Sequence, residues 1–412
     1  MDNIILHCDL NNFFASVELL NHPEFKTYPV AVCGNSEERH GIILAKNEVA
    51  KKFGVKTAEV IWQAKQKCPD LILLSPNMDK YISYSKQVRR IYENYTDLIE
   101  PFGIDECWLD VTGSTLLFGN GFEIATKIKE HVKSETGLTI SVGVSFNKIF
   151  AKLGSDMKKP DAITEISKSN YQSLVWPLPV SELLGVGKAT CSLFHKYGIN
   201  TIGDLAKSEL TFIQSALGKN GEALWYYANG ICNSKVEHKD ATSIPKSIGN
   251  SITCSEDLSN CEEVWKVMYC LTENVAKRLR KNHLLAGSVQ ISVKDTNLFT
   301  REFQAPLPFS TRHPKDISEL GIHLFQKNYH WTEKVRAIGI RAIHLVPDDE
   351  YMQYSFSYDY NKISELEALE EKVCFLRDKY GNSAIQRASL LGAQKEPKEQ
   401  KYDESSLPNK IK

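Results

Sequence analysis

Two adjacent acids, Asp105 and Glu106, lie inside an apolar stretch, and this feature constrains the fold more than any other in the chain. Residues 102–110 read FGIDECWLD, so large apolar side chains flank the pair on both sides. Two unpaired carboxylates in buried surroundings repel each other or shift their pKa values unless a positive group lies between them. The pair therefore either reaches solvent at a turn or holds a cation.

The length and composition of the chain are those of a globular protein with several domains. At 412 residues the chain exceeds what one hydrophobic core can organise, so we expect roughly two to four domains. Hydrophobic residues make up 42% of the sequence and charged residues 25%, as in folded proteins. The formal net charge of −1 gives no overall basic signal, so any nucleic-acid surface must come from charge gathered on one face or domain.

Cysteine usage and the N-terminal sequence indicate a cytoplasmic protein. The 10 cysteines include no CxxC pair, which argues against a zinc site and against a secreted disulfide framework. The N-terminal residues MDNIILHCDL lack the basic segment of a signal peptide, and no apolar run approaches the length of a membrane span. We therefore expect a reduced, cytosolic protein with no membrane partner.

The order of predicted elements in the first part of the chain indicates a mixed sheet with helices. The apolar run at residues 4–8 predicts a buried strand that ends at Asp9, and residues 12–20 have helical spacing. Helical spacing returns at 82–95 and 122–134, strand-like sequence fills 138–146, and a turn at Gly103 divides 100–111 into two strands. We expect an α+β sheet whose helices pack on one side.

The remainder of the chain indicates a helical region, a linker and a second, smaller α+β domain. Residues 166–232 are mostly helical in pattern, residues 234–242 are a polar linker, and a helix at 262–281 precedes strand-like sequence at 288–295 and 335–346. Residues 243–346 contain 14 Lys and Arg against 10 Asp and Glu, which favours a polyanionic partner. Beyond them we expect one charged helix at 361–380 and a partly disordered tail.

Asp9 and the Asp105–Glu106 pair would meet at one site if their strands are neighbours. Carboxylates of this kind can bridge two divalent cations, of which one activates an attacking oxygen and the other stabilises a leaving pyrophosphate. Because side chains alternate along a strand, both members of the pair can face one site only where the hairpin twists or bulges. Taken alone, the pair also fits a solvated turn, and Asp9 also fits a helix cap.

Three long motifs give the chain a specific resemblance. CDLNNFFASVE, GIDECWLDVTGS and SVGVSFNKIFAKLGSDMKKP, in this order and spacing, resemble the Y-family DNA polymerases, the translesion branch of polymerases. The resemblance implies a right-hand architecture over about residues 1–345. Its expected parts are a ferredoxin-like palm at 1–22 and 78–165, fingers at 23–77, a helical thumb at 166–233, a linker at 234–242, a little-finger domain at 243–346, and a tail at 347–412.

The resemblance implies a metal-dependent catalytic site. Asp9, Asp105 and Glu106 match the family's metal-binding triad, and Leu10 lies where the family offers a main-chain carbonyl to the metal. The implied cofactor is Mg²⁺, two ions per site, with Mn²⁺ as a possible substitute. Asn11 replaces an acid that many relatives have beside the triad, and this loss is expected to be tolerated.

The resemblance also implies a site for the incoming deoxynucleotide. Phe14 matches the steric gate, a ring beneath the sugar that collides with a 2′-hydroxyl, although a pair of Phe residues at a helix start also fits a buried core. The backbone amides of Asn12, Phe13 and Phe14 would cradle phosphate oxygens at a helix N-terminus. Lys159 matches a lysine that grips the triphosphate, although by itself it would be a surface lysine.

The fingers segment departs from the family pattern at four positions. Leu44, Ala45, Glu48 and Lys51 stand where the family has a small residue, a hydroxyl residue, Tyr and Arg. Two hydroxyl donors are lost, at about 1.5–3 kcal/mol each if nothing replaces them, and Lys51 lacks the fork of an Arg. Glu48 would repel a triphosphate unless it pairs with Lys51 or Lys52. Because Leu44 adds bulk over the new base pair, we hypothesise a narrower range of bypassed lesions.

Several segments are expected to bind DNA or partner proteins. The sequence ELLGVGKAT followed by YGINTIGDL predicts a helix-hairpin-helix at 182–205, whose glycines let backbone N–H groups approach a phosphate, although a plain helix turn also fits. The candidate DNA contacts are Gly185, Gly187, Lys188, Lys246, Arg336 and Arg341. The segment from Gln353 to Tyr358 is a weak match to a peptide that binds the replication sliding clamp.

The sequence is compatible with three functions. The first is a low-fidelity DNA polymerase that extends primer–template DNA with dNTPs in DNA repair, as a nucleoid-associated monomer in a bacterial cytoplasm. The second is a DNA-binding accessory protein of the same fold with weakened catalysis, which Leu44, Ala45 and Glu48 would favour and the intact triad opposes. The third, a nucleotide cyclase, is disfavoured by the helix-hairpin-helix and the trailing domain.

Overall fold

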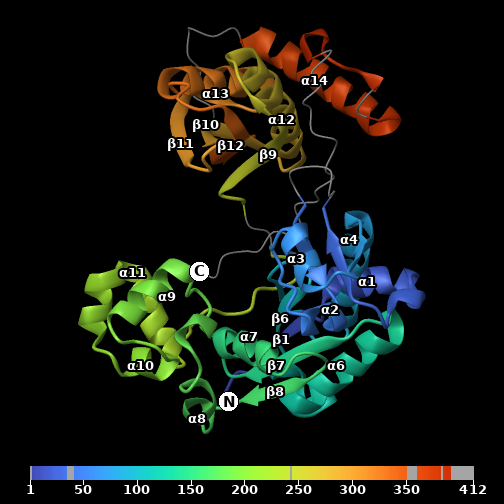
Figure 1. The fold of residues 1–412 in the computed structure, drawn as a ribbon, viewed down its shortest axis with the longest axis vertical. Helices are drawn as coiled ribbons and strands as arrows, with labels where there is room; N and C mark the ends of the chain where they lie inside the picture. The colour runs from blue at the N-terminus through green and yellow to red at the C-terminus, as the bar shows by residue number, and fades with distance from the viewer. Residues whose placement is uncertain (1, 35–40, 242–243, 350–359, 382–383, 391–412) are drawn as a thin grey trace. The chain divides into compact units, whose positions relative to one another are not determined.

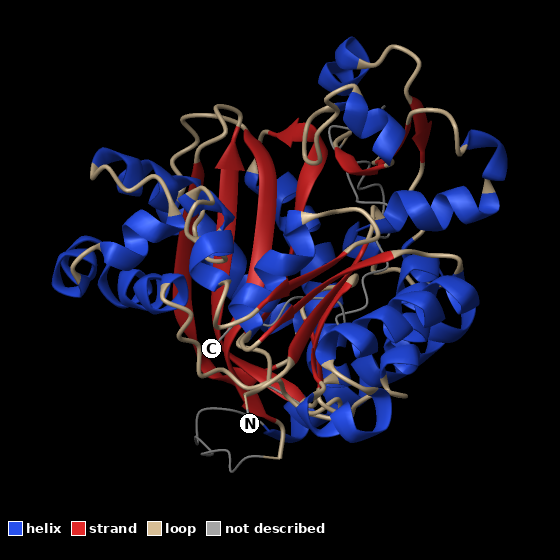
Figure 2. Cartoon of the chain, turned by 90° about the horizontal axis from the view of Figure 1, so that it is seen from below, coloured by secondary structure: helices blue, strands red, loops and turns tan. Residues whose placement is uncertain are grey.

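The computed structural model describes residues 2–34, 41–241, 244–349, 360–381 and 384–390. These residues form two compact units, the first up to Ala241 and the second from 244 onward (Figure 1). Both units combine helices with sheets, as the colouring of Figure 2 shows, so the expected α+β class is confirmed. Within this described part of the chain, no helix is both long and apolar enough to cross a membrane.

A five-stranded sheet in the order β5-β6-β1-β7-β8 organises the first unit. Its strands are β1 (Ile5–Leu10), β5 (Ile99–Pro101), β6 (Glu106–Asp110), β7 (Ile140–Ser145) and β8 (Ile163–Ile166). The central strand β1 is buried along its whole length and pairs antiparallel with β6 and β7. The predicted strands and the turn at Gly103, whose φ is 129°, are therefore present.

Helices cover both faces of this sheet, so the expectation that they pack on one side is wrong. The helices of this part of the chain are α1 (Phe13–Asn21), α4 (Met78–Tyr92), α5 (Thr115–Phe118), α6 (Gly121–Thr136) and α7 (Lys148–Met157). Leu6 and Cys8 pack in the core with α1, α4 and α6, whereas Ile5 and Trp108 pack with Ala151 of α7. Because both alternating sets of β1 side chains are buried, β1 is covered on two sides, although it includes the polar residues His7 and Asp9.

The close approach of α7 to β7 depends on Gly143, and replacing this glycine with alanine is expected to destabilise the first unit. A Cβ at this position would lie 1.9 Å from the carbonyl oxygen of Ala151 and 2.5 Å from the nitrogen of Ser155. We expect Gly143→Ala to lower the free energy of unfolding by about 2–3 kcal/mol, measured by chemical denaturation. The matched control is Gly113→Ala, where a Cβ would meet nothing within 4 Å. Equal effects of the two variants would contradict the prediction.

A three-stranded sheet in the order β3-β2-β4 forms a separate layer of the first unit. Its elements are β2 (Val30–Cys33), β3 (Ile43–Lys46), β4 (Ile72–Leu74), α2 (Glu48–Lys52) and α3 (Ile61–Lys67). Ile43, Ala50 and Ala64 bury their side chains in its own small core. The first residue of α2 is Glu48, whose position becomes important for the site.

Two helices, α9 and α10, lie in the segment for which the sequence predicts a helix-hairpin-helix, and two more flank them. The helices of this region are α8 (Tyr171–Val175), α9 (Lys188–Lys196), α10 (Ile202–Lys207) and α11 (Leu210–Ala228). Gly185 has a φ of 96°, which favours glycine, and Gly187 is the residue just before α9. Gly185, Gly187 and Lys188 are exposed.

The beginning of the predicted linker is bound to the first unit. The buried Lys148 ammonium lies 2.6 Å from the Glu100 carboxylate and also donates to the Ser234 hydroxyl at 3.3 Å. The other oxygen of Glu100 accepts from the backbone N–H of Glu237 at 3.0 Å. The segment that leaves the helical region is therefore fixed by one buried ion pair before the first unit ends.

The second unit is a four-stranded antiparallel sheet, in the order β11-β10-β12-β9, covered by two helices. Its elements are β9 (Ser247–Leu258), α12 (Cys261–Lys281), β10 (Leu284–Asp295), β11 (Thr300–Thr311), α13 (Pro314–Asn328) and β12 (Val335–Pro347). Met268 of α12 and Phe325 of α13 are fully buried against Val289 and Ile340 of the sheet. The predicted helix and the two predicted strands of this region are present.

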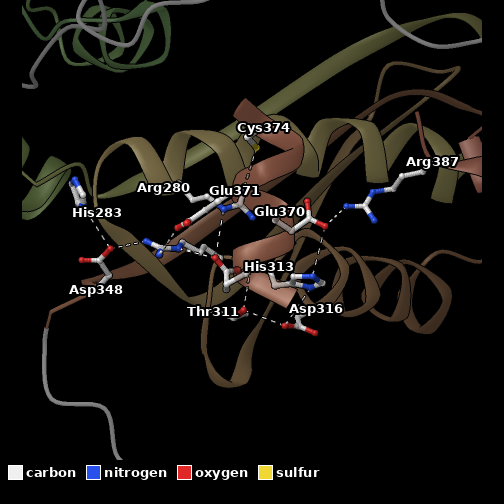
Figure 3. Close-up of polar contacts among 12 residues, drawn as sticks. Arg280, His283, Thr311, His313, Asp316, Asp348, Glu370, Glu371, Cys374 and Arg387 are labelled. Atoms are coloured by element: carbon white, nitrogen blue, oxygen red, sulfur yellow. Dashed lines mark hydrogen bonds and ion pairs between the residues drawn. The ribbon is translucent and has the colours of Figure 1, made fainter. Parts of the chain in front are cut away.

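Ion pairs attach a further helix, α14 (Tyr360–Tyr380), to the second unit (Figure 3). Arg312 pairs with Glu367 of α14 at 3.0 Å. Glu370, only 6% exposed, pairs with Arg387 and lies 3.9 Å from the His313 ring. Charged side chains that are largely buried therefore attach the predicted helix of the tail. A search of the sequence for an apolar helix face does not detect an attachment of this kind.

Candidate active site

The pairing of β1 with β6 brings the predicted carboxylates together. Asp9 lies directly opposite Glu106 in the register of the two strands. Asp105 immediately precedes β6, and its carbonyl oxygen accepts from the backbone N–H of Leu10 at 3.1 Å. Because Asp105 belongs to the turn and not to the strand, strand alternation does not force it away from Glu106. Leu10, the last residue of β1, lies at this junction, and its assignment as a carbonyl donor to a metal stays a prediction.

Two lysines of the α7 region lie among the carboxylates. The Lys159 ammonium is 2.7 Å from an Asp9 oxygen and 2.8 Å from Asp156. The Lys152 ammonium is 2.9 Å from Glu106, 3.4 Å from Asp9 and 3.3 Å from Asp156. Lys159 was predicted from the motif, but Lys152 and Asp156 were not. Together the two ammonium groups balance part of the negative charge of the site.

Burial and neighbouring charges shift the pKa values of Asp105, Asp9 and Lys152. Burial, with Asp9 and Glu106 close by, raises the pKa of Asp105 to about 7. Burial likewise raises the pKa of Asp9, although Lys159 opposes the shift. Burial alone would lower the pKa of Lys152, but Glu106, Asp9 and Asp156 raise it. Burial and the neighbouring acids therefore favour the neutral form of Asp105 when no cation is bound.

A buried histidine lies directly behind Glu106. The His7 ring is fully buried, contacts the Ser155 hydroxyl at 2.8 Å through Nδ1, and has Nε2 3.4 Å from Glu106 Oε2. Burial lowers the pKa of His7 well below its usual value. His7 Nε2 and Glu106 Oε2 are both buried polar atoms for which the described residues supply no hydrogen-bond partner.

These observations fit a site for divalent cations. Asp9, Asp105 and Glu106 supply the hard oxygen ligands that Mg²⁺ prefers, and the orphaned oxygen of Glu106 needs a positive partner. Within the described residues, no three acidic, His or Cys side chains already surround a single point. Lys152 and Lys159 instead contact the acids directly, so cation binding at Asp9 requires Lys159 to move away from this carboxylate.

The predicted gate ring is supported by a second aromatic side chain. The Phe14 ring stacks on the Tyr81 ring of α4, with centroids 4.2 Å apart and planes 10° apart. The buried Tyr81 hydroxyl donates to Glu18 at 2.7 Å, and Lys80 lies 3.7 Å from the same carboxylate. The ring is therefore held between α1 and α4, and Phe13 fills the core beneath it.

The divergent fingers residues lie on β3 and α2. Leu44 and Ala45 are partly buried residues of β3, and Ala45 pairs with Val32 of β2. Glu48 accepts a hydrogen bond from the Asn12 side chain at 3.0 Å and lies 3.6 Å from the Lys51 ammonium. The expectation that Glu48 needs a lysine partner is met by Lys51.

Three predicted DNA contacts, Lys246, Arg336 and Arg341, lie in the second unit. Lys246 and Arg341 are exposed, and Arg336 is partly buried. Arg341 on β12 pairs with Gly249 of β9. A side chain at position 249 would collide with the side chain of Arg341. The segment from Gln353 to Tyr358 lies outside the described residues, so the clamp-binding hypothesis stays a prediction.

Sequence reasoning missed the groups that support the acids and the ring. The signal for Lys152 was its spacing from Asp156, because residues four apart on a helix share a face. Lys159 follows Asp156 by three positions, so its side chain continues the same row of charged groups. His7 and Tyr81 gave no local signal, because their partners come from elements far away in the chain.

The raised pKa of Asp105 predicts a pH dependence of stability. Because the folded pKa of about 7 exceeds the usual value, the folded chain binds more protons than the unfolded chain between these two values. Without divalent cations, the free energy of unfolding should fall by on the order of 2 kcal/mol between pH 5 and pH 8, relative to Asp105→Asn. Chemical denaturation of both proteins at each pH measures this difference. Parallel pH profiles of the two proteins would contradict the prediction.

The fold and the site together define a multidomain α+β protein with a carboxylate site on its central sheet. A model of the impB/mucB/samB family matches residues 8–156, and a model of the C-terminal domain of that family matches residues 245–356. A protein named DNA polymerase IV from Acetivibrio thermocellus is 49% identical over 391 residues, which cover 95% of this chain and 98% of the relative.

A more distant relative and a solved structure point to the same family and fold. DNA polymerase IV 1 of Bacillus subtilis is 37% identical over 391 residues, which cover 94% of this chain and 93% of the relative. A solved Y-family DNA polymerase chimera shares the fold, with a TM-score of 0.75 at 24% identity over 84% of this chain and 99% of the chimera. The chain belongs to the impB/mucB/samB family of Y-family DNA polymerases, which confirms the resemblance carried by its motifs.

Proposed function

We propose that this chain, a translesion DNA polymerase by its family, adds dNTPs to a primer 3′-hydroxyl at the site formed by Asp9, Asp105 and Glu106. The observation that carries the proposal is the direct cross-strand pairing of Asp9 with Glu106, with Asp105 in the adjoining turn. The charge of this site, which its lysines only partly balance, supports a role for divalent cations.

The carboxylates and the Leu10 carbonyl would hold two Mg²⁺ ions. Bound Mg²⁺ supplies Lewis acidity to the 3′-oxygen and neutralises charge on the triphosphate oxygens. Asp9, Asp105 and Glu106 would fix where that positive charge lies, and Trp108 and Leu109 pack β6, the strand that carries Glu106. Catalysis on this account depends on positioning and on electrostatic stabilisation, with no covalent intermediate.

One of the two lysines, Lys159, would exchange partners when a nucleotide binds. Lys159 and Lys152 contact Asp9 and Glu106 in the structure. A triphosphate is a stronger acceptor for an ammonium group than a carboxylate that also binds a cation, so Lys159 would turn to the phosphates. Lys152, which is more buried, would remain with the acids and with Asp156.

The selection of the sugar is assigned to Phe14, and the range of accepted templates to Leu44. The ring of Phe14, backed by Tyr81, would block a 2′-hydroxyl, and the amides of residues 12–14 would face phosphate oxygens. Leu44 would narrow the space over the new base pair, which limits bypass of bulky minor-groove adducts.

The rest of the chain would hold primer–template DNA. We assign the palm, fingers, thumb and little-finger roles to the residue ranges predicted above, with backbone contacts at Gly185 and Gly187. Lys188, Lys246, Arg336 and Arg341 would add phosphate contacts that position without reading sequence. The protein would act as a monomer in the bacterial nucleoid, with the sliding clamp as a candidate partner at 353–358.

Primer extension tests this function. Extension is measured with Mg²⁺ and dNTPs on an undamaged template and on one with a bulky minor-groove adduct. We expect extension of the undamaged template and a stop at the adduct. Efficient bypass of the adduct would refute the assignment to Leu44. Intact DNA binding with no extension on either template would favour the accessory protein, because Ala45 and Glu48 would then have disabled catalysis.

A further inference from the structure

Asn12, the residue before α1, does not cap its own helix. A residue at this position usually has an extended backbone and accepts a hydrogen bond from the helix with its side chain. Asn12 instead has φ 50° and ψ 39°, the left-handed conformation, and makes no side-chain cap. Its side-chain amide donates to the Glu48 carboxylate at 3.0 Å, across 36 positions of sequence. The side chain therefore connects α1 to the first residue of α2.

Glu48 is held firmly enough to act as a fixed acceptor. The preceding Asn47 is buried, and its side-chain oxygen accepts from the backbone N–H groups of Ala50 at 2.9 Å and Val30 at 3.1 Å. Its amide donates to the Tyr28 carbonyl at 2.8 Å. The bond with Ala50 caps α2, and the bonds with Val30 and Tyr28 fix the start of this helix to β2 and to the residues just before it, so the backbone at Glu48 is held in place.

The charge of Glu48 is directed toward Asn12 and Lys51. The carboxylate oxygen that accepts from Asn12 also lies 3.6 Å from the Lys51 ammonium. A hydrogen bond to an ionised acceptor is stronger than one between neutral groups. Glu48 is partly exposed, so water weakens the interaction, but the amide and the ammonium approach the same oxygen.

We propose that the Asn12–Glu48 hydrogen bond is a latch that sets the orientation of the nucleotide-binding end of α1. The inference rests on the proposed function, because residues 12–14 supply the amides and the ring that would face the incoming nucleotide. Phe14 is fixed on one side by stacking on Tyr81, and Asn12 is fixed on the other side by Glu48. Glu48 is thus a positioning residue for sugar selection, and it couples the three-stranded sheet to the gate.

If the Asn12–Glu48 bond acts as this latch, its loss should change the KM for the nucleotide and the discrimination between dNTPs and rNTPs. Loss of the hydrogen bond leaves the triad in place but lets the left-handed residue and the gate ring shift. Glu48→Ala should raise the KM for a dNTP and lower discrimination against the matching rNTP, each by about 3–10-fold, with kcat nearly constant. Glu48→Gln keeps an acceptor oxygen for Asn12, so it should restore most of the discrimination that Glu48→Ala loses.

A double-mutant cycle tests the latch. The variants are Glu48→Ala, Asn12→Ala and the double variant, assayed for single dNTP and rNTP insertion. We expect the double variant to be no worse than the poorer single variant, because both remove the same bond. Asn12→Gly keeps access to the left-handed backbone but lacks the amide, so Glu48→Ala in that background should change nothing further. Glu93→Ala, which removes a partly exposed pair with Lys239, is the matched control.

A second readout does not depend on activity. Amide hydrogen exchange of residues 12–16 should be faster in Glu48→Ala than in the unaltered protein, and Glu48→Gln should reverse most of the increase. Additive effects in the cycle, or equal exchange in all variants, would overturn the latch. A lower KM for dNTPs in Glu48→Ala would also overturn it, because Glu48 would then simply repel the triphosphate. An inactive parent protein with the predicted exchange pattern would instead count against the proposed function and keep the latch.

Discussion

Replacing Asp105 with asparagine is expected to lower the rate of dNTP insertion by at least about 10³-fold. Asparagine preserves the size of the side chain but removes the negative charge that would hold a cation. The pKa of Asp105, raised to about 7 by burial and by Asp9 and Glu106, indicates that this charge adds to a concentrated anionic site. The measurement is single-turnover insertion at saturating Mg²⁺, with DNA affinity determined separately by fluorescence anisotropy.

Asp110→Asn is the matched control for this variant. Asp110 lies at the far end of β6, the strand that Asp105 immediately precedes, but its carboxylate accepts from the backbone N–H of Thr112 at 3.0 Å and from the Thr112 hydroxyl. An asparagine oxygen can accept both bonds, so activity should stay within a few-fold of the parent, roughly 3-fold at most. Similar losses in Asp105→Asn and Asp110→Asn would show that Asp105 only supports the fold.

Removing the ring of Phe14 is expected to reduce discrimination between dNTPs and rNTPs by roughly 100-fold. The ring would exclude the 2′-hydroxyl by collision, so its loss admits the ribose without creating any new contact. Phe14 stacks on Tyr81 at 4.2 Å, and Phe14→Tyr can keep this stacking and most of the bulk. We therefore expect Phe14→Ala to accept ribonucleotides and Phe14→Tyr to continue to reject them.

The ratio of kcat/KM for a dNTP to that for the matching rNTP, measured on the same template, decides this prediction. A ratio in Phe14→Ala equal to that of the parent protein would contradict the gate assignment, even if both activities fell. An equal fall for both nucleotides would identify Phe14 as a core residue, which is the other interpretation of adjacent Phe residues at a helix start.

The convergence of the acids was predictable because each acid is tied to a strand with a clear pattern. The apolar run before Asp9 and the hairpin around Gly103 specify two strands, and the short hairpin turn brings Asp105 to the end of its strand. What the pattern left open was how adjacent acids can share a site. The structure resolves this point, because Asp105 lies in the turn and Glu106 begins β6.

The supporting residues were not predictable, because their contacts join distant segments. His7 meets Ser155 across 148 positions, and Tyr81 meets Glu18 across 63. The hydrophobic pattern of one segment does not indicate which residue of a distant segment it contacts. The second helical layer on the sheet was missed for a related reason, since the short strand β1 gave no sign that both of its faces are covered.

Single-nucleotide insertion with Mg²⁺, testing each of the four dNTPs opposite one template base, measures the central claim most directly. The account predicts preferred insertion of the complementary dNTP, complete loss when EDTA removes divalent cations, and loss in Asp105→Asn with DNA binding intact. Insertion that continues in Asp105→Asn, or no insertion by the parent protein at any dNTP concentration while it still binds DNA, would contradict it.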